Sequence, residues 1–237
     1  SLKSKEKELM MKVVVYNQQK HKEQLNNNLA ARVHALKRML SQTRGNEIRK
    51  YLMETSINAN DWVKRRISYT SSLAVTSMAG YLIGIDDRHL QNIMMKCKMA
   101  RIVHIDFGDC FEVLKKRDRF PEMVPFRLTR VFLNGLEVTQ VDGTFRKRCE
   151  EVMSVIRDNG EMVSELLETF IYDPLLNCET IFGEATEIVE RIKEKLNGSD
   201  FHTEKPLNVQ EQVDYLIKEA TNLDNLVLMY SGWNPLF

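Results

Sequence analysis

Three polar side chains on two short segments of this chain could carry out chemistry together. Residues 84–92 contain Asp87 and Asn92, five positions apart, and residues 103–109 contain Asp106. A carboxylate can orient an attacking hydroxyl group, and further oxygen ligands can hold Mg²⁺ on the phosphates of a nucleotide. The set therefore predicts phosphoryl transfer from a nucleotide.

Two β-prone runs are expected to bring these side chains together. Residues 93–95 and 102–105 are short apolar runs separated by a basic turn. Two such runs with a short connection are typical of a β-hairpin. We therefore expect a hairpin that presents Asn92 and Asp106 side by side.

Apolar side chains at helical spacing predict helices through most of the remaining chain. These helices are expected at residues 29–44, 48–53, 62–84, 145–158, 162–171, 184–196 and 208–230. Asn60, Thr144 and Asn208 are predicted N-caps, and the apolar stripes of the helices at 145–158 and 162–171 are expected to face the core. The expected fold class is mainly α (α+β), with a short β-hairpin at the active site.

Composition and charge limit the class of protein. The chain has 237 residues, of which 43% are hydrophobic and 28% charged, so a globular core is expected. A net charge of +1 gives no overall electrostatic footprint for nucleic acid, and we expect no nucleic-acid partner. The four cysteines have no metal-ligand spacing, which favours a reducing compartment. We expect a cytoplasmic protein, with the nucleus and endomembrane surfaces as alternatives.

The order of the motif residues resembles a known family. Protein kinases also place a metal-binding Asn five residues after the catalytic Asp, followed by Asp-Phe-Gly, but they have His-Arg-Asp where residues 87–89 read Asp-Arg-His. The inverted order, followed by His-Ile-Asp-Phe-Gly-Asp at 104–109, resembles the phosphatidylinositol 3-kinase-related kinases. Cys-Phe-Glu-Val at 110–113, Arg-Phe-Pro-Glu at 119–122 and Val-Pro-Phe-Arg-Leu-Thr-Arg at 124–130 are most similar to target of rapamycin (TOR) kinases.

The resemblance implies roles for the polar residues. Asp87 would orient the substrate hydroxyl and accept its proton. His89 would lie near the transferring phosphate, where an imidazole N–H can stabilise developing charge. Asn92 and Asp106 would ligate Mg²⁺.

The resemblance also implies how ATP would be bound. Met94 and Ile105 match positions that form an apolar floor under adenine, although apolar residues of this kind are more often simply core. Gly108 is expected to give the turn after Asp106 its backbone freedom. ATP and Mg²⁺ are therefore the expected cofactors.

The resemblance suggests three segments. Residues 1–32 would be an N-terminal helical or loop extension, 33–200 a kinase C-lobe of the PI3K/PI4K type, and 205–237 a FATC segment. Only Gly45 precedes Gly80, so a glycine-rich phosphate loop is absent, and the N-lobe of a kinase is not recognisable in this sequence. We therefore expect these 237 residues alone to be inactive.

One residue departs from the family pattern inside the motif. Asp86 stands where the family usually has glycine before the catalytic Asp. A second carboxylate could repel the charge of Asp87 or point to solvent. The substitution bears on catalytic efficiency more than on family membership.

The expected function is serine/threonine protein kinase catalysis of the TOR type, with transfer of the ATP γ-phosphate to protein hydroxyls. Expected partners are protein substrates and TOR-complex-like proteins, including a β-propeller subunit. A phosphoinositide lipid kinase is one alternative, since basic residues 115–119 could contact a headgroup, and an inactive pseudokinase scaffold is another. A membrane contact would be possible only through the aromatic tail around Trp233. We expect this tail to pack as a buried terminus instead.

Overall fold

A computed structural model describes residues 25–116, 121–172, 185–201, 203 and 205–236. Most of the predicted extension at 1–32 lies outside these residues. The helices are α2 (Leu25–Gln42), α3 (Glu47–Glu54), α4 (Ala59–Ile83), α5 (Arg130–Gly135), α6 (Thr144–Asp158), α7 (Gly160–Ile171), α9 (Ala185–Asn197), α10 (Val209–Thr221) and α11 (Leu223–Leu228). Short 3₁₀ turns are η1 (Leu90–Asn92), η2 (Val113–Lys116), η3 (Gln140–Asp142) and η4 (Ser231–Trp233). The expected fold class, mainly helical with one hairpin, is confirmed.

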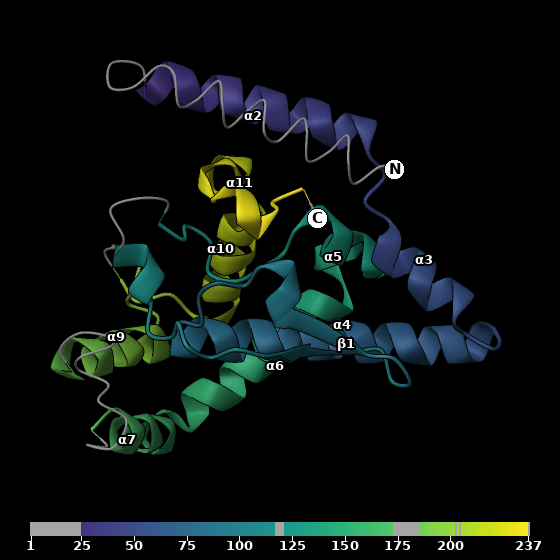
Figure 1. Cartoon of the computed structure of the whole chain (residues 1–237). Helices are drawn as coiled ribbons and strands as arrows, with labels where there is room; N and C mark the ends of the chain where they lie inside the picture. Colours follow the sequence, from purple (N-terminus) through teal and green to yellow (C-terminus); the bar gives the residue numbers. More distant parts are fainter. Residues whose placement is uncertain (1–24, 117–120, 173–184, 202, 204, 237) are drawn as a thin grey trace.

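The long helix α4 runs through the centre of the molecule, with α6 packed along it (Figure 1). Its N-cap is Asn58, whose side chain accepts a hydrogen bond from the Asp61 amide, so the predicted cap at Asn60 is wrong by two residues. The helix ends at Gly84, which has a φ of 65°. A Cβ there would lie 2.8 Å from the Glu112 nitrogen, so glycine is required where α4 passes into the loop that carries Asp87.

The predicted hairpin is confirmed, with strand ends that differ from the prediction by one residue. Strands β1 (Ile93–Lys96) and β2 (Arg101–His104) are antiparallel, and Met94 pairs with Val103. Alternate side chains face opposite sides of such a ladder. Ile102 is buried in the main core with α4, whereas Met94 is 55% exposed on the other face.

The main core lies between α4, α6 and α10, and α7 contributes less to burial than expected. Phe145, Cys149 and Met153 of α6 are fully buried, as predicted. Thr144 is the first residue of α6 and its hydroxyl donates to Glu137, so the predicted cap is wrong. On α7 the predicted core stripe is only partly correct, because three of its residues are exposed: Met162, Leu166 and Phe170.

The C-terminal segment is two helices rather than the single helix predicted for 208–230. The predicted N-cap Asn208 is confirmed, and it forms a capping box with Glu211 at the start of α10. The chain breaks at Asn222, whose side chain accepts a hydrogen bond from the Asp224 amide and so caps α11. Figure 1 shows α11 lying between α10 and α2, and the two latter helices each contact it.

The aromatic tail packs as a buried terminus, as expected. Trp233 is 0% exposed and belongs to a cluster that includes Leu36 and Met39 of α2 and Leu226 of α11. The tail therefore joins the first described helix to the end of the chain. None of the helices in the described ranges is long and apolar enough to cross a bilayer.

We predict that Trp233→Ala lowers the free energy of unfolding by about 3–5 kcal/mol, because it removes a fully buried indole and leaves a cavity. Denaturant unfolding of the 237-residue chain would measure the change. Val138→Ala is the control, because Val138 is 97% exposed. Equal stability of the two variants would contradict the packed-terminus assignment.

Candidate active site

Two loops meet at the base of the hairpin and bring the predicted site residues into one region. The Ile105 amide donates to the Asn92 carbonyl (3.0 Å), and the Asp86 amide donates to the Asp109 carbonyl (2.9 Å). These bonds tie the segment that carries Asp87 and Asn92 to the segment that carries Asp106. The sequence prediction that these segments lie together is confirmed.

Arg88 braces the two loops from inside. Its side chain is 2% exposed, and its Nε donates to the Asp86 carbonyl at 2.8 Å. Its Nη1 and Nη2 donate to the carbonyls of Ile105 and Asp106 in the other loop. Because its side-chain nitrogens donate to backbone carbonyls, Arg88 acts as a structural brace.

Asp87 is held on three sides. Its φ of 55° is in the left-handed region, which Asp adopts more readily than most residues. Its amide donates to Glu122 Oε2 (2.7 Å), and its carboxylate Oδ1 accepts a hydrogen bond from the Tyr230 hydroxyl (3.0 Å). The other oxygen, Oδ2, lies 3.6 Å from His89 Nε2. One carboxylate oxygen therefore has a donor from the tail, and the other faces the predicted catalytic histidine.

The hydrogen bonds of His89 fix which ring nitrogen acts as a donor. Nδ1 accepts a hydrogen bond from the Gln91 amide at 3.2 Å. In the neutral ring the proton must then be on Nε2, the nitrogen that faces Asp87. The histidine can therefore donate from Nε2 next to the carboxylate.

Asn92 and Asp106 supply oxygen atoms suited to a hard cation. The amide nitrogen of Asn92 donates to the Asp87 carbonyl (3.0 Å), which leaves its oxygen to act as a ligand. Asp106 is exposed, with a φ of 60°, and its Oδ1 accepts from the Gly108 amide at 3.2 Å. Within the described ranges no cluster of three or more His, Cys, Asp or Glu side chains could hold a metal. Two oxygen ligands still fit Mg²⁺, which commonly takes one or two carboxylates and completes its shell with phosphates and water.

The role of Gly108 in the structure differs from the role predicted from the sequence. The residue with a left-handed backbone in this turn is Asp106 itself, whereas Gly108 has no positive φ. A Cβ on Gly108 would lie 3.3 Å from Asp106 Oδ1, which is a tight contact. The glycine therefore gives room to the carboxylate more than it gives freedom to the backbone.

Met94 and Ile105 lie on the exposed side of the hairpin. They are 55% and 40% exposed, and Val103, which pairs with Met94, is half-buried. An exposed apolar surface beside the candidate metal ligands suits an aromatic base. Their role under adenine stays a prediction.

Asp86 does not point to solvent, so that expectation is wrong. Its side chain is buried, and Oδ2 accepts a hydrogen bond from the Leu114 amide at 2.8 Å. Burial raises the pKa of Asp86 to about 6, although the Leu114 amide and Lys115 oppose this shift. The carboxylate fixes the start of η2 to the loop.

Sequence reasoning missed the residues that connect the site to the C-terminal tail. Glu122 accepts from Trp233 Nε1 (3.0 Å) through the oxygen that does not bind the Asp87 amide, and burial raises the pKa of Glu122 to about 7. Arg127 donates to the carbonyls of Arg88 (3.1 Å) and Trp233 (2.6 Å). Both residues stand in the stretches 119–122 and 124–130 that carry the family resemblance, and this was the one available signal.

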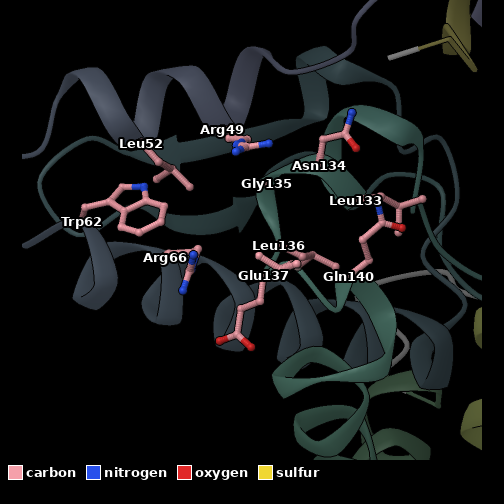
Figure 2. A pocket seen from close by; sticks show the side chains of 11 residues that line it. Arg49, Leu52, Trp62, Arg66, Leu133, Asn134, Gly135, Leu136, Glu137 and Gln140 are labelled. Atoms are coloured by element: carbon pink, nitrogen blue, oxygen red, sulfur yellow. The ribbon is translucent and has the colours of Figure 1, made fainter. Parts of the chain in front are cut away.

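A cavity lies away from this site, between α3, α4 and α5 (Figure 2). It has a volume of about 300 Å³ and contains none of the predicted site residues. Leu52 comes from α3, Trp62 and Arg66 from α4, and Leu133 from α5. Arg66 stacks on Trp62 with its guanidinium carbon 4.3 Å from the ring centroid, which accounts for the position of both side chains by contacts within α4.

Comparisons with known proteins agree with the family resemblance predicted from the sequence motifs. Serine/threonine-protein kinase mTor of Drosophila melanogaster is 36% identical, over 88% of this chain and 11% of its own length. Serine/threonine-protein kinase TOR of Oryza sativa subsp. japonica is 41% identical, over 88% of this chain and 12% of its own length. The chain thus spans about a tenth of these relatives.

Solved structures of related proteins have a similar fold. The solved structure described as "FAT and kinase domain of CtTel1" superposes with a TM-score of 0.82 at 28% identity, over 98% of this chain and 16% of that one. The pattern of the phosphatidylinositol 3- and 4-kinase family matches residues 2–180, and that of the FATC domain matches residues 206–237. This chain therefore belongs to the phosphatidylinositol 3- and 4-kinase family and ends in a FATC domain.

Proposed function

We propose that this chain is the catalytic C-lobe of a TOR-like serine/threonine protein kinase, which transfers the γ-phosphate of ATP to protein hydroxyl groups. One observation carries the proposal. Arg88 binds carbonyls of both loops and so holds the segment with Asp87 and Asn92 beside the segment with Asp106. These are the residue types that phosphoryl transfer needs for orienting a hydroxyl and holding a metal.

Each residue then has a distinct task. Asp87 accepts the proton of the substrate hydroxyl through Oδ2, the oxygen that faces His89. His89 donates from Nε2 toward charge that develops on the phosphoryl oxygens. The side-chain oxygens of Asn92 and Asp106 would hold Mg²⁺, and the ion would supply positive charge to neutralise the phosphates of ATP.

Met94 and Ile105 provide one wall of the nucleotide site. In kinases a glycine-rich loop and a lysine of the N-lobe cover the phosphates from the other side. In the part of the chain that the structure describes, the hairpin β1–β2 is the only sheet. In this proposal the hairpin forms the wall of the nucleotide site that the C-lobe provides. The division into an extension at 1–32, a C-lobe at 33–200 and a FATC segment at 205–237 is part of this proposal.

A protein hydroxyl is favoured over a lipid headgroup as the substrate. The relatives that match over most of the chain are named as serine/threonine-protein kinases. Of the basic residues expected to meet a headgroup, Lys115 is paired with Glu112 at 2.8 Å, and 117–119 lie outside the described residues. The buried carboxylate of Asp86 accepts its hydrogen bond from the Leu114 amide and not from the loop that carries Asp87. This arrangement supports an active kinase over a scaffold.

We predict that Asp87→Asn and Asp106→Ala each lower phosphate incorporation into a protein substrate at least ~100-fold, because each removes a positioned acid–base or metal-binding group. The assay requires an active preparation that contains this chain together with an N-lobe. Asp158→Asn on the exposed side of α6 is the matched control and should retain activity. Turnover near that of the wild type in either site variant would refute the assignment.

We predict that Asp86→Asn stabilises the protein at pH 8 but not at pH 4. The folded-state pKa of about 6 lies above the ordinary 3.8, so stability from this group is full below pH 3.8 and is lost as the pH rises through 6. Asparagine keeps an acceptor for the Leu114 amide without the buried charge. The gain at pH 8 should reach up to about 3 kcal/mol.

Denaturant unfolding at both pH values, with Asp158→Asn as the control, measures this difference. A destabilisation of the same size at both pH values would show that Asp86 is not a buried charge that opposes folding.

We predict that the 237-residue chain alone binds Mg²⁺–ATP weakly and transfers little phosphate. A single wall leaves the phosphates open to water and without the cation that positions them. Calorimetry with Mg²⁺–ATP and a phosphate-transfer assay would measure both properties. Micromolar affinity with turnover would contradict the proposed need for an N-lobe.

A further inference from the structure

A tyrosine of the C-terminal FATC segment reaches the candidate catalytic base. Tyr230 follows α11, and its hydroxyl donates to Asp87 Oδ1 at 3.0 Å across 143 residues of sequence. Burial, followed by the hydrogen bond and the charge of Asp87, raises the pKa of Tyr230 to about 12. The phenol therefore keeps its proton at physiological pH and acts as the donor in this bond.

The tail is built to hold this ring in place. The Trp233 amide donates to the Tyr230 carbonyl at 3.1 Å, and the Trp233 side chain is fully buried. A Cβ on Gly232 would overlap the Tyr230 ring, so the glycine allows the ring to lie against the backbone. Arg127 fixes the same turn by donating to the Asn234 carbonyl at 2.7 Å. The phenol therefore approaches Asp87 from a rigid support.

The two oxygens of Asp87 have different surroundings. Oδ1 accepts from Tyr230, and Oδ2 lies 3.6 Å from His89 Nε2. A carboxylate that is held through one oxygen loses rotational freedom, and the second oxygen is then aimed at a fixed point. Because Asp87 is 26% exposed at its side chain, the second oxygen can still be reached by a substrate hydroxyl.

We propose that Tyr230 is a positioning residue for the phosphoryl transfer, supplied by the FATC segment, and that it orients Asp87 toward the substrate hydroxyl. The inference rests on the proposed kinase function. Tyr230 acts through Asp87 and has no direct contact with the phosphates. Its loss should therefore lower kcat and leave the binding of Mg²⁺–ATP largely unchanged.

Tyr230→Phe in an active preparation that contains this chain tests the kinetic role. We expect kcat for a protein substrate to fall about tenfold, with KM for Mg²⁺–ATP within about twofold of the wild type, since a hydrogen bond to a charged group is lost. Gly232→Ala, which displaces the ring without removing the hydroxyl, should lower kcat in the same way.

Tyr215→Phe is the matched control. Tyr215 lies on α10 in the same FATC segment, its ring packs at a tilt against that of Phe201, and no hydrogen bond of its hydroxyl occurs among the described residues. It should keep the kcat of the wild type. An unchanged kcat in Tyr230→Phe would overturn the proposal. An increased kcat would also overturn it, because the tyrosine would then compete with the substrate for Asp87.

A second measurement needs no catalysis and uses the 237-residue chain. The ¹³Cζ resonance of Tyr230, identified by its loss in Tyr230→Phe, is followed with increasing pH while circular dichroism monitors the fold. The charged groups near the phenol are Asp87, Glu122 and Arg127. In the wild type we expect no titration up to pH 11, and in Asp87→Asn we expect titration to begin at lower pH, because the charged acceptor is gone.

Identical titration in both proteins would overturn the contact between Tyr230 and Asp87. If the wild type shows this contact but no preparation transfers phosphate, the proposed function fails and the positioning role fails with it. If the wild type is active and Tyr230→Phe is equally active, only the positioning role fails.

Discussion

The site depends on the buried guanidinium of Arg88. Its donors go to carbonyls of Asp86, Ile105 and Asp106, so one side chain holds both loops, in addition to the backbone hydrogen bonds that join them. Burying a charge is costly unless its hydrogen bonds are made, and here they are made to the backbone that must be positioned. Lysine could not replace it, because an ammonium group lacks the planar fork that reaches two loops at once.

This brace explains why the backbone can be strained where the chemistry is expected. Asp87 and Asp106 both have left-handed φ values, of 55° and 60°. Such conformations are sparsely populated for residues other than glycine and persist where the surroundings over-determine them. Glu122 adds a second restraint by accepting the amide of Asp87, and it is itself bound by Trp233. The C-terminal segment thus contributes to the site as well as to the core.

Local patterns in the sequence predicted much of the fold. The hairpin, the end of α4 at Gly84 and the capping box at Asn208 follow from side-chain spacing and turn chemistry, which act between near neighbours. Errors arose where several neighbouring residues could serve the same role. Asn58 and Asn60 are both good caps, and the choice between them was made by the fold.

The site was predictable only in part. The order Asp-Arg-His and the following Asp-Phe-Gly predicted roles for Asp87 and Asp106, because this chemistry has a fixed spacing in the chain, and the structure brings their two segments together. Tyr230 was only the last residue of the helix predicted for 208–230, since a contact across 143 residues leaves no local pattern. The burial of Asp86 was equally invisible, because it depends on the amide of Leu114, 28 residues away.

The proposed function requires that Asn92 and Asp106 hold one metal beside Asp87. Paramagnetic line broadening tests it directly, since Mn²⁺ can replace Mg²⁺ with a non-hydrolysable ATP analogue, and weak binding is sufficient. We expect backbone amide signals of Asp87, Asn92 and Asp106 to broaden together, Asp106→Ala to abolish the effect, and signals around the Figure 2 cavity to remain sharp. Broadening centred on that cavity, or broadening at the loops that persists in Asp106→Ala, would contradict it.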